Sequence, residues 1–253
     1  MLGYNHFKSL TSEKKMFYIF LATHLIVWSC IGLIRTVMPT DTLEGIYWGS
    51  LHDFGTPKHP PLAGWLTYLA YIPFKLDFCT YLLSQAFILG GFIFIYKIAR
   101  KFLDEQKSML SVIVLEGCWV YSYITGYYGF NPDVVLLFIL PCITYCFYNC
   151  MKFDKPLNWV ILGIIVGIAF LNKYQTAFLI LPMLIWALMF KRDIFKNIWF
   201  YFSIVTAFII FSPHILWLMH YDFFPFMYFE GEMNSNSIWN HISAPLMFVV
   251  MQL

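Results

Sequence analysis

Ionisable side chains gather in one short stretch of an otherwise apolar chain, residues 39–65. Asp41 and Glu44 are three positions apart, and Asp53 and His59 follow before a double proline. A carboxylate can accept the proton of an attacking hydroxyl group, and an imidazole can exchange protons near neutral pH. So many polar groups beside a long apolar run need either a structural reason or a functional one.

A structural reason exists for the first two acids. An apolar periodicity of three and four residues over 42–53 predicts an amphipathic helix that includes Tyr47. Asp41 followed by Glu44 at the start of that helix resembles a capping box. Capping and catalysis are compatible, because a helix N-terminus keeps a carboxylate ionised. Both interpretations of Asp41 therefore stay open.

Three further polar positions lie at the edges of apolar runs. Asn131, Pro132 and Asp133 have the order of a helix start, with Asn as the cap and Pro at the first position. Asp133 is either part of that start or a second carboxylate of a site. Lys173 and Arg35 are basic residues at membrane edges, where lysine commonly extends to water. An anionic ligand would give either of them a function.

Composition excludes an ordinary water-soluble domain. The chain is 60% hydrophobic and 12% charged, against about 45–50% apolar and about 25% charged in soluble domains. Its net charge of +2 gives no reason to expect nucleic-acid binding. No nucleotide-binding or hydrolase motif of the P-loop, GxGxxG, HExxH or GxSxG type is present.

Apolar runs long enough to approach the ~20 residues of a spanning helix predict about seven complete transmembrane helices. They lie near residues 16–38, 78–98, 108–126, 131–150, 158–172, 174–190 and 197–219. A last run opens at 244 and stops at Leu253, which predicts a truncated helix. Glu116 falls inside the third run, where a charge costs about 2.5–3.5 kcal/mol. It should face the interior of the bundle.

The distribution of basic residues predicts the orientation. Twelve of the sixteen Lys and Arg residues flank the N-terminus and alternate loops, which places these segments on the inner side. Residues 39–77 then form a long outer loop. Within it, 62–74 is apolar but short, and we expect an interfacial helix there.

A family resemblance rests on four ordered motifs. Asp41-x-x-Glu44 follows the first span, and His59-Pro-Pro-Leu-x-x-Trp-Leu comes some fifteen residues later. Gly129-Phe-Asn-Pro-Asp133 and Phe170-Leu-Asn-Lys-Tyr174 follow. Over about residues 10–250 the chain resembles polyprenyl-phosphate-sugar-dependent glycosyltransferases of the GT-C fold. The nearest groups are bacterial relatives of dolichyl-phosphate-mannose–protein mannosyltransferase and of lipid A aminoarabinose transferase.

The resemblance implies an all-α polytopic membrane protein with a GT-C-like bundle, in which 1–253 is one module of a longer family architecture. It implies transfer of a sugar from a polyprenyl-phosphate donor to a glycolipid, glycan or protein acceptor, with inversion. The setting implied is a bacterial inner membrane, with the site facing the periplasm. A divalent cation is compatible with His59 and the nearby acids but is not required by their spacing.

The resemblance also implies roles for individual residues. Asp41, Glu44 and Asp133 would be the catalytic acids, with Asp41 as the base. The cations expected to hold the donor phosphate are Lys173, Arg35 and Lys58, and the expected substrate-binding residues are His59, Tyr47 and Tyr174. Two other functions remain open from the sequence: a transporter or flippase of a lipid-linked or anionic solute, and an inactive truncated paralogue.

Overall fold

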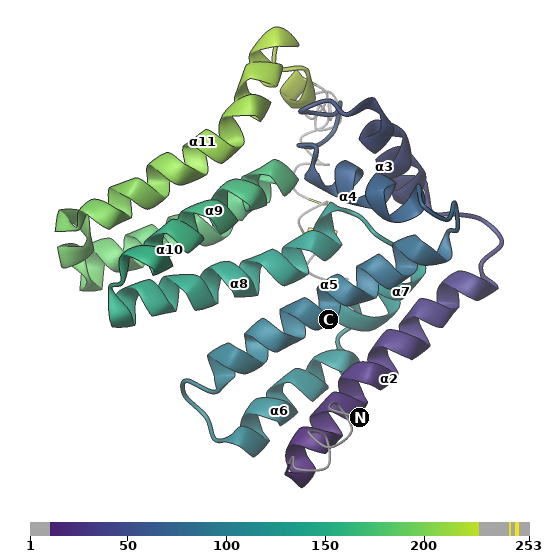
Figure 1. The fold of residues 1–253 in the computed structure, drawn as a ribbon, viewed down its shortest axis with the longest axis horizontal. Coiled ribbons are helices and arrows are strands. Elements are labelled where there is room, and N and C mark those ends of the chain that lie inside the picture. The colour runs from purple at the N-terminus through teal and green to yellow at the C-terminus, as the bar shows by residue number, and fades with distance from the viewer. Residues whose placement is uncertain (1–10, 228–242, 244–245, 248–253) are drawn as a thin grey trace.

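The computed structural model describes residues 11–227, 243 and 246–247, and this part of the chain is helical without a strand (Figure 1). Four of its helices are long and apolar enough to cross a membrane. They are α2 (Ser12–Ile34), α5 (Phe78–Ala99), α8 (Pro132–Phe153) and α11 (Ile198–His220). Two apolar helices are shorter, α9 (Pro156–Asn172) and α10 (Ala177–Phe190), and the turn η3 (Tyr174–Thr176) separates them. The protein is therefore an all-α polytopic membrane protein, as the sequence predicts.

The expected third span, 108–126, is not a continuous helix. In its place stand α6 (Glu105–Ile113), a 3₁₀ turn η1 (Val114–Gly117), a π-helical turn η2 (Val120–Ile124) and a short α7 (Thr125–Tyr128). Cys118, between the two turns, is extended, with φ −82° and ψ 119°. The prediction of about seven complete spans is therefore wrong for this segment, which is not one complete helix. The run expected from 244 lies largely outside the described residues.

Two short helices, α3 (Thr40–Leu51) and α4 (Leu62–Tyr71), lie together at one end of the bundle (Figure 1). They are the helices expected within the 39–77 loop. Their contact depends on glycines, because a Cβ at Gly49 would collide with the carbonyl oxygen of Gly64. A Cβ at Gly45 would lie 2.9 Å from Thr67 Oγ1. Close helix contact through small residues fixes where α3 and α4 sit.

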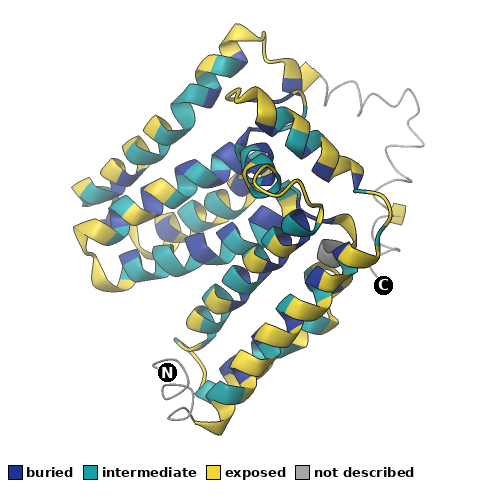
Figure 2. Ribbon diagram, turned by 45° about the vertical axis from the view of Figure 1, so that its right-hand side comes forward, coloured by how far each residue is buried: buried dark blue, intermediate teal, exposed yellow. Residues whose placement is uncertain are grey.

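The packed interior is centred on α5, α8 and α9. Ile88, Val135 and Trp159, one from each of these helices, are almost completely buried. Figure 2 shows many exposed positions along α2 and α11 and buried positions concentrated in the helices between them. Exposed apolar faces on the outer helices are expected where lipid, and not water, surrounds the bundle.

Basic residues collect at the helix ends away from α3 and α4. Lys97 is in the last turn of α5 and Lys152 in the last turn of α8, while α5 and α8 begin at the α3–α4 end. Lys14 lies in the first turns of α2, whose other end leads into α3. We call the two ends of the bundle the α3–α4 end and the basic end.

Candidate active site

A small cleft opens at the α3–α4 end, between α3, α4, the loop joining them and the start of α8. Its cavity volume is about 50 Å³. The side chains with chemistry that line it are Asp41, Glu44, Trp48, Thr56, Lys58, His59 and Asn131. Residues from distant parts of the chain therefore meet in one cleft.

Helix α3 presents Asp41, Glu44 and Trp48 to the cleft on one face, at the three- and four-residue spacing of a helix. Tyr47, on the same helix, is 63% exposed and does not line the cleft. Pro39 is the N-cap, and no side chain caps this helix. The capping interpretation of Asp41 is therefore wrong: Asp41 lies in the first turn and has no hydrogen-bond or ion-pair partner among the described residues.

A tight turn over 56–59 positions the next two groups. The Thr56 hydroxyl donates to the His59 carbonyl oxygen at 2.7 Å and accepts from the His59 backbone N–H at 2.9 Å. The Thr56 N–H also donates to the same carbonyl at 3.0 Å. These bonds close the turn and direct Lys58 and His59 toward α3.

Lys58 and Glu44 form an ion pair across the cleft. The ammonium nitrogen of Lys58 lies 2.7 Å and 2.9 Å from the two carboxylate oxygens of Glu44. It also lies 5.7 Å from the centre of the Trp48 ring, within the range of a cation–π contact. Both charged side chains are about a third exposed.

A second ion pair joins the start of α8 to the end of α9. Lys173 donates to Asp133 at 2.6 Å, and Asn172 donates to the Pro132 carbonyl at 2.9 Å. Asn131 caps α8, because its side-chain oxygen accepts from the N–H groups of Asp133 and Val134. The expected helix start is thus confirmed, and Asp133 at the same time faces a cation.

His59 lies within the field of Lys173, Asp133, Asp41 and Lys58. Burial lowers the pKa of His59 below 6.5, and the positive charge of Lys173 lowers it further. The negative charges of Asp133 and Asp41 raise this pKa, and Lys58 lowers it. The imidazole is therefore neutral at pH 7, and five groups expected from the sequence share one neighbourhood.

Of the nine expected residues, four line the cleft: Asp41, Glu44, Lys58 and His59. Asp133 and Lys173 are outside the lining but act electrostatically on His59. The other three are not brought to the cleft. Arg35 donates to the Tyr127 carbonyl oxygen at 2.5 Å. Its guanidinium carbon also lies 4.0 Å from the centre of the Tyr127 ring. Tyr47 is exposed on α3 and does not line the cleft. The Tyr174 hydroxyl is 2.7 Å from His214 Nε2, so it joins η3 to α11.

Sequence reasoning missed Trp48, Thr56 and the lining role of Asn131. The signal for Trp48 was present, because it stands four positions after Glu44 on the same helical face. Thr56 gave no signal, since its role depends on the folded turn. Within residues 11–227, 243 and 246–247, no group of three or more His, Cys, Asp or Glu side chains is arranged to hold a metal ion.

The fold and the cleft together define a helical membrane protein with carboxylates, an imidazole and ammonium groups at one end of its bundle. The sequence model of the family described as dolichyl-phosphate-mannose-protein mannosyltransferase matches residues 58–217, and the chain belongs to that family. It is accordingly a membrane glycosyltransferase of the GT-C type. The matched region includes Lys58, His59, Asp133 and Lys173 and begins after Asp41. Neither a curated protein nor a solved structure matches the chain.

Proposed function

We propose that this protein transfers a sugar from a polyprenyl-phosphate donor to a hydroxyl group of a lipid, glycan or protein, on the outer face of the membrane. The acceptor oxygen forms a bond to the anomeric carbon while the bond from that carbon to the phosphate oxygen breaks. The acceptor's proton passes to a carboxylate, and the polyprenyl phosphate leaves with the bonding electrons. The configuration at the anomeric carbon is inverted.

Asp41 is the proposed base. Its carboxylate lines the cleft, is exposed and has no partner within the described part of the chain. A base must be free to take a proton from the acceptor, which a carboxylate already paired with a lysine is less able to do. Asp41 lies in the first turn of α3.

Lys58 and Lys173 are the proposed cations for the donor phosphate. Each is held by an acid, Glu44 or Asp133, so the charge is already oriented before the donor arrives. A cavity of about 50 Å³ has room for one or two water molecules. When a sugar enters, the ion pair across the cleft parts, and the phosphate then replaces a carboxylate as the partner of the lysine.

His59 is proposed to contact the sugar. A neutral imidazole between the two lysines can donate one hydrogen bond and accept another, which suits a sugar hydroxyl. The bond to Thr56 fixes the backbone that carries it. Asp133 would act on the substrate only after Lys173 has turned to the phosphate.

The outer location is supported by the two ends of the bundle. Lys97 and Lys152 lie at the basic end, while the cleft lies at the α3–α4 end. Short loops rich in Lys and Arg stay on the inner side of a membrane. The cleft would then face outward, and a donor anchored in the lipid could reach it.

The observation that carries the proposal is that Asp41, His59 and Lys58 line one cleft, while the charge of Lys173 acts on His59, in a member of this family. Mass spectrometry of envelope lipids, glycans and glycoproteins from cells with the intact gene and from a deletion strain tests it. We expect one sugar mass to be missing from one product class in the deletion strain and to return with the gene. Identical spectra, with the protein present in the membrane of the intact strain, would contradict it.

A further inference from the structure

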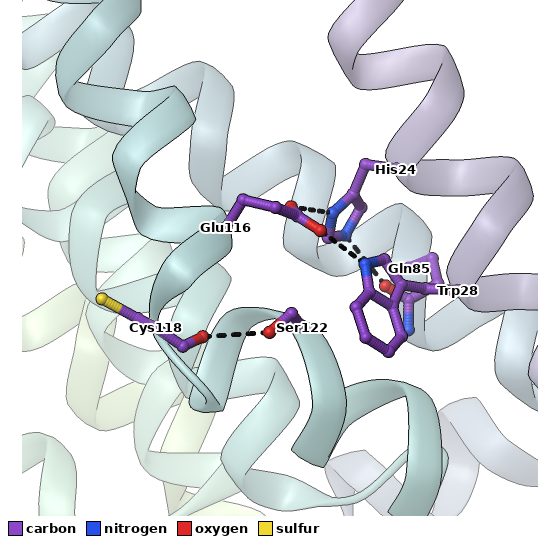
Figure 3. A network of polar contacts seen from close by, with 6 residues as sticks. All are labelled: His24, Trp28, Gln85, Glu116, Cys118 and Ser122. Atoms are coloured by element: carbon purple, nitrogen blue, oxygen red, sulfur yellow. Dashed lines mark hydrogen bonds and ion pairs between the residues drawn. The ribbon is translucent and has the colours of Figure 1, made fainter.

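Figure 3 shows a polar network between helices of the bundle. None of its residues lines the cleft. Glu116, on the 3₁₀ turn η1, accepts from Trp28 Nε1 at 2.5 Å and lies 2.6 Å from His24 Nδ1. His24 and Trp28 are one turn apart on α2. His24 Nε2 contacts Gln85 Oε1 on α5 at 3.0 Å. The network thus joins α2, α5 and the interrupted span.

The chemical types of the contacting atoms limit where the protons of this network can lie. An amide oxygen is an acceptor only, so His24 Nε2 carries a proton toward Gln85. The Trp28 indole is a donor only, so Glu116 accepts this bond. His24 Nδ1 and the second carboxyl oxygen of Glu116 share one proton at 2.6 Å, and the His24 side chain is completely buried.

Few other ionisable groups lie beside this pair. The Phe92 ring of α5 is 5.1 Å from the His24 ring and 5.5 Å from the ring of Tyr121 on η2. Cys118 lies between η1 and η2, two residues after Glu116. In the described part of the chain, neither His24 nor Glu116 is paired with a lysine or arginine side chain.

The backbone that carries Glu116 is irregular, although it lies in a segment expected to cross the membrane. After η1, Cys118 is extended and η2 is π-helical, so the helical ladder is interrupted where Glu116 turns toward α2. Irregular backbone inside a membrane occurs where it is buried in protein or lines a cavity. An ionisable residue there is a candidate for function by default.

The interrupted segment leads directly into the cleft. It ends at Tyr128, and Asn131 and Pro132 line the cleft a few residues later. Two side chains hold the joining residues: Ser84 donates to the Gly129 carbonyl at 3.4 Å and Thr42 to the Phe130 carbonyl at 3.3 Å. A shift of η1 along α2 would therefore move the wall of the cleft.

From these contacts we infer that His24 and Glu116 form an ion pair and are positioning residues: the pair holds the interrupted span against α2 and thereby sets the position of residues 129–132 in the cleft. The part of this inference that concerns catalysis rests on the proposed function. The ion pair itself does not, and it can be tested without any sugar transfer.

The first test uses dicyclohexylcarbodiimide, an apolar reagent that modifies protonated carboxyl groups inside membranes. The native protein in membranes at pH 7 should resist labelling at Glu116, read by peptide mass spectrometry. H24Q removes the imidazolium, and Glu116 should then become protonated and labelled at least tenfold more. S29A is the matched control, since the Ser29 hydroxyl is buried on the same helix without a partner in the described chain. Equal labelling of native protein and H24Q would overturn the inference.

If H24Q does not fold, W28F decides the same question. It removes one donor to Glu116 and leaves both charges in place, so labelling should rise several-fold. Unchanged labelling in W28F would count against the network.

The second test measures transfer of the sugar in isolated membranes. H24Q and E116Q should lower the rate at least tenfold, S29A should leave it unchanged, and the exchanged pair H24E/E116H should restore part of it. Normal rates in both single variants would overturn the positioning role. A native protein that transfers no sugar would instead refute the proposed function, and the labelling result would still decide whether the ion pair exists.

Discussion

Lys173 and Asp133 are forty residues apart in the chain, yet the Lys173 ammonium donates to the Asp133 carboxylate at 2.6 Å. The lysine side chain is 13% exposed and the carboxylate 69% exposed. A buried cation paired with an exposed anion can exchange that anion for another without a new cation being buried. This pair is therefore suited to receive a phosphate group.

Replacing Lys58, which lines the cleft, or Lys173, whose charge acts on His59, should weaken donor binding. Lys58→Met and Lys173→Met each remove a charged donor, and hydrogen bonds to charged groups are worth about 1.5–3 kcal/mol. We expect the donor KM to rise about tenfold or more in each variant, measured by initial rates in isolated membranes. Lys75→Met, an exposed lysine of the same loop outside the cleft, should leave it unchanged. A donor KM that moves no more in these two variants than in this control would exclude the phosphate role.

The pKa of His59 should respond in opposite directions to the two members of the second ion pair. Lys173→Met removes a positive charge that lowers this pKa, so the pKa should rise. Asp133→Asn removes a negative charge that raises it, so the pKa should fall. NMR titration of histidine-labelled protein in detergent measures both, with His59→Gln to assign the signal. Shifts of the same sign would contradict the arrangement.

The lowered pKa of His59 also predicts how stability depends on pH. The unfolded chain takes up this proton near pH 6.5, while the folded protein takes it up only at a lower pH. The unfolded state therefore gains protons first as pH falls, and His59 destabilises the fold progressively below pH 6.5. His59→Gln should reduce this loss when thermal unfolding is compared at pH 7 and pH 5. An unchanged pH dependence would show that His59 does not contribute.

The contact between α3 and α4 should tolerate no side chain at Gly49. Gly49→Ala places a methyl group against the backbone of Gly64, and overpacking of this kind costs about 1–3 kcal/mol. The thermal unfolding midpoint in detergent should fall, and transfer should fall with it. Gly117→Ala is the control, because a Cβ there meets nothing within 4 Å. Equal midpoints in both variants would argue against the close contact.

Hydropathy and charge predict most of the fold, because each apolar run must pair its own backbone groups inside a membrane. They could not predict the interruption at Glu116. That break depends on partners in α2 and α5, which are remote in sequence. The helix start at Asn131 was predictable, since capping is local.

The candidate site was predictable only in part. The spacing of Asp41 and Glu44 and the motif at His59 identified members of the cleft, but not which acid pairs with which lysine. The pairs Glu44–Lys58 and Asp133–Lys173 are tertiary contacts. Arg35 and Tyr174 looked equally suitable in the sequence, yet they bond to Tyr127 and His214.

The rate of sugar transfer by Asp41→Asn tests the central claim most directly, once the deletion strain has identified the product. Asp53→Asn is the matched control, an acid of the same loop outside the cleft lining. A general base contributes about 10²–10⁴-fold to a rate. We predict that Asp41→Asn loses activity by at least a hundredfold with a normal amount of protein in the membrane, while Asp53→Asn keeps the native rate. An Asp41→Asn rate equal to that of the control would contradict the assignment of the base.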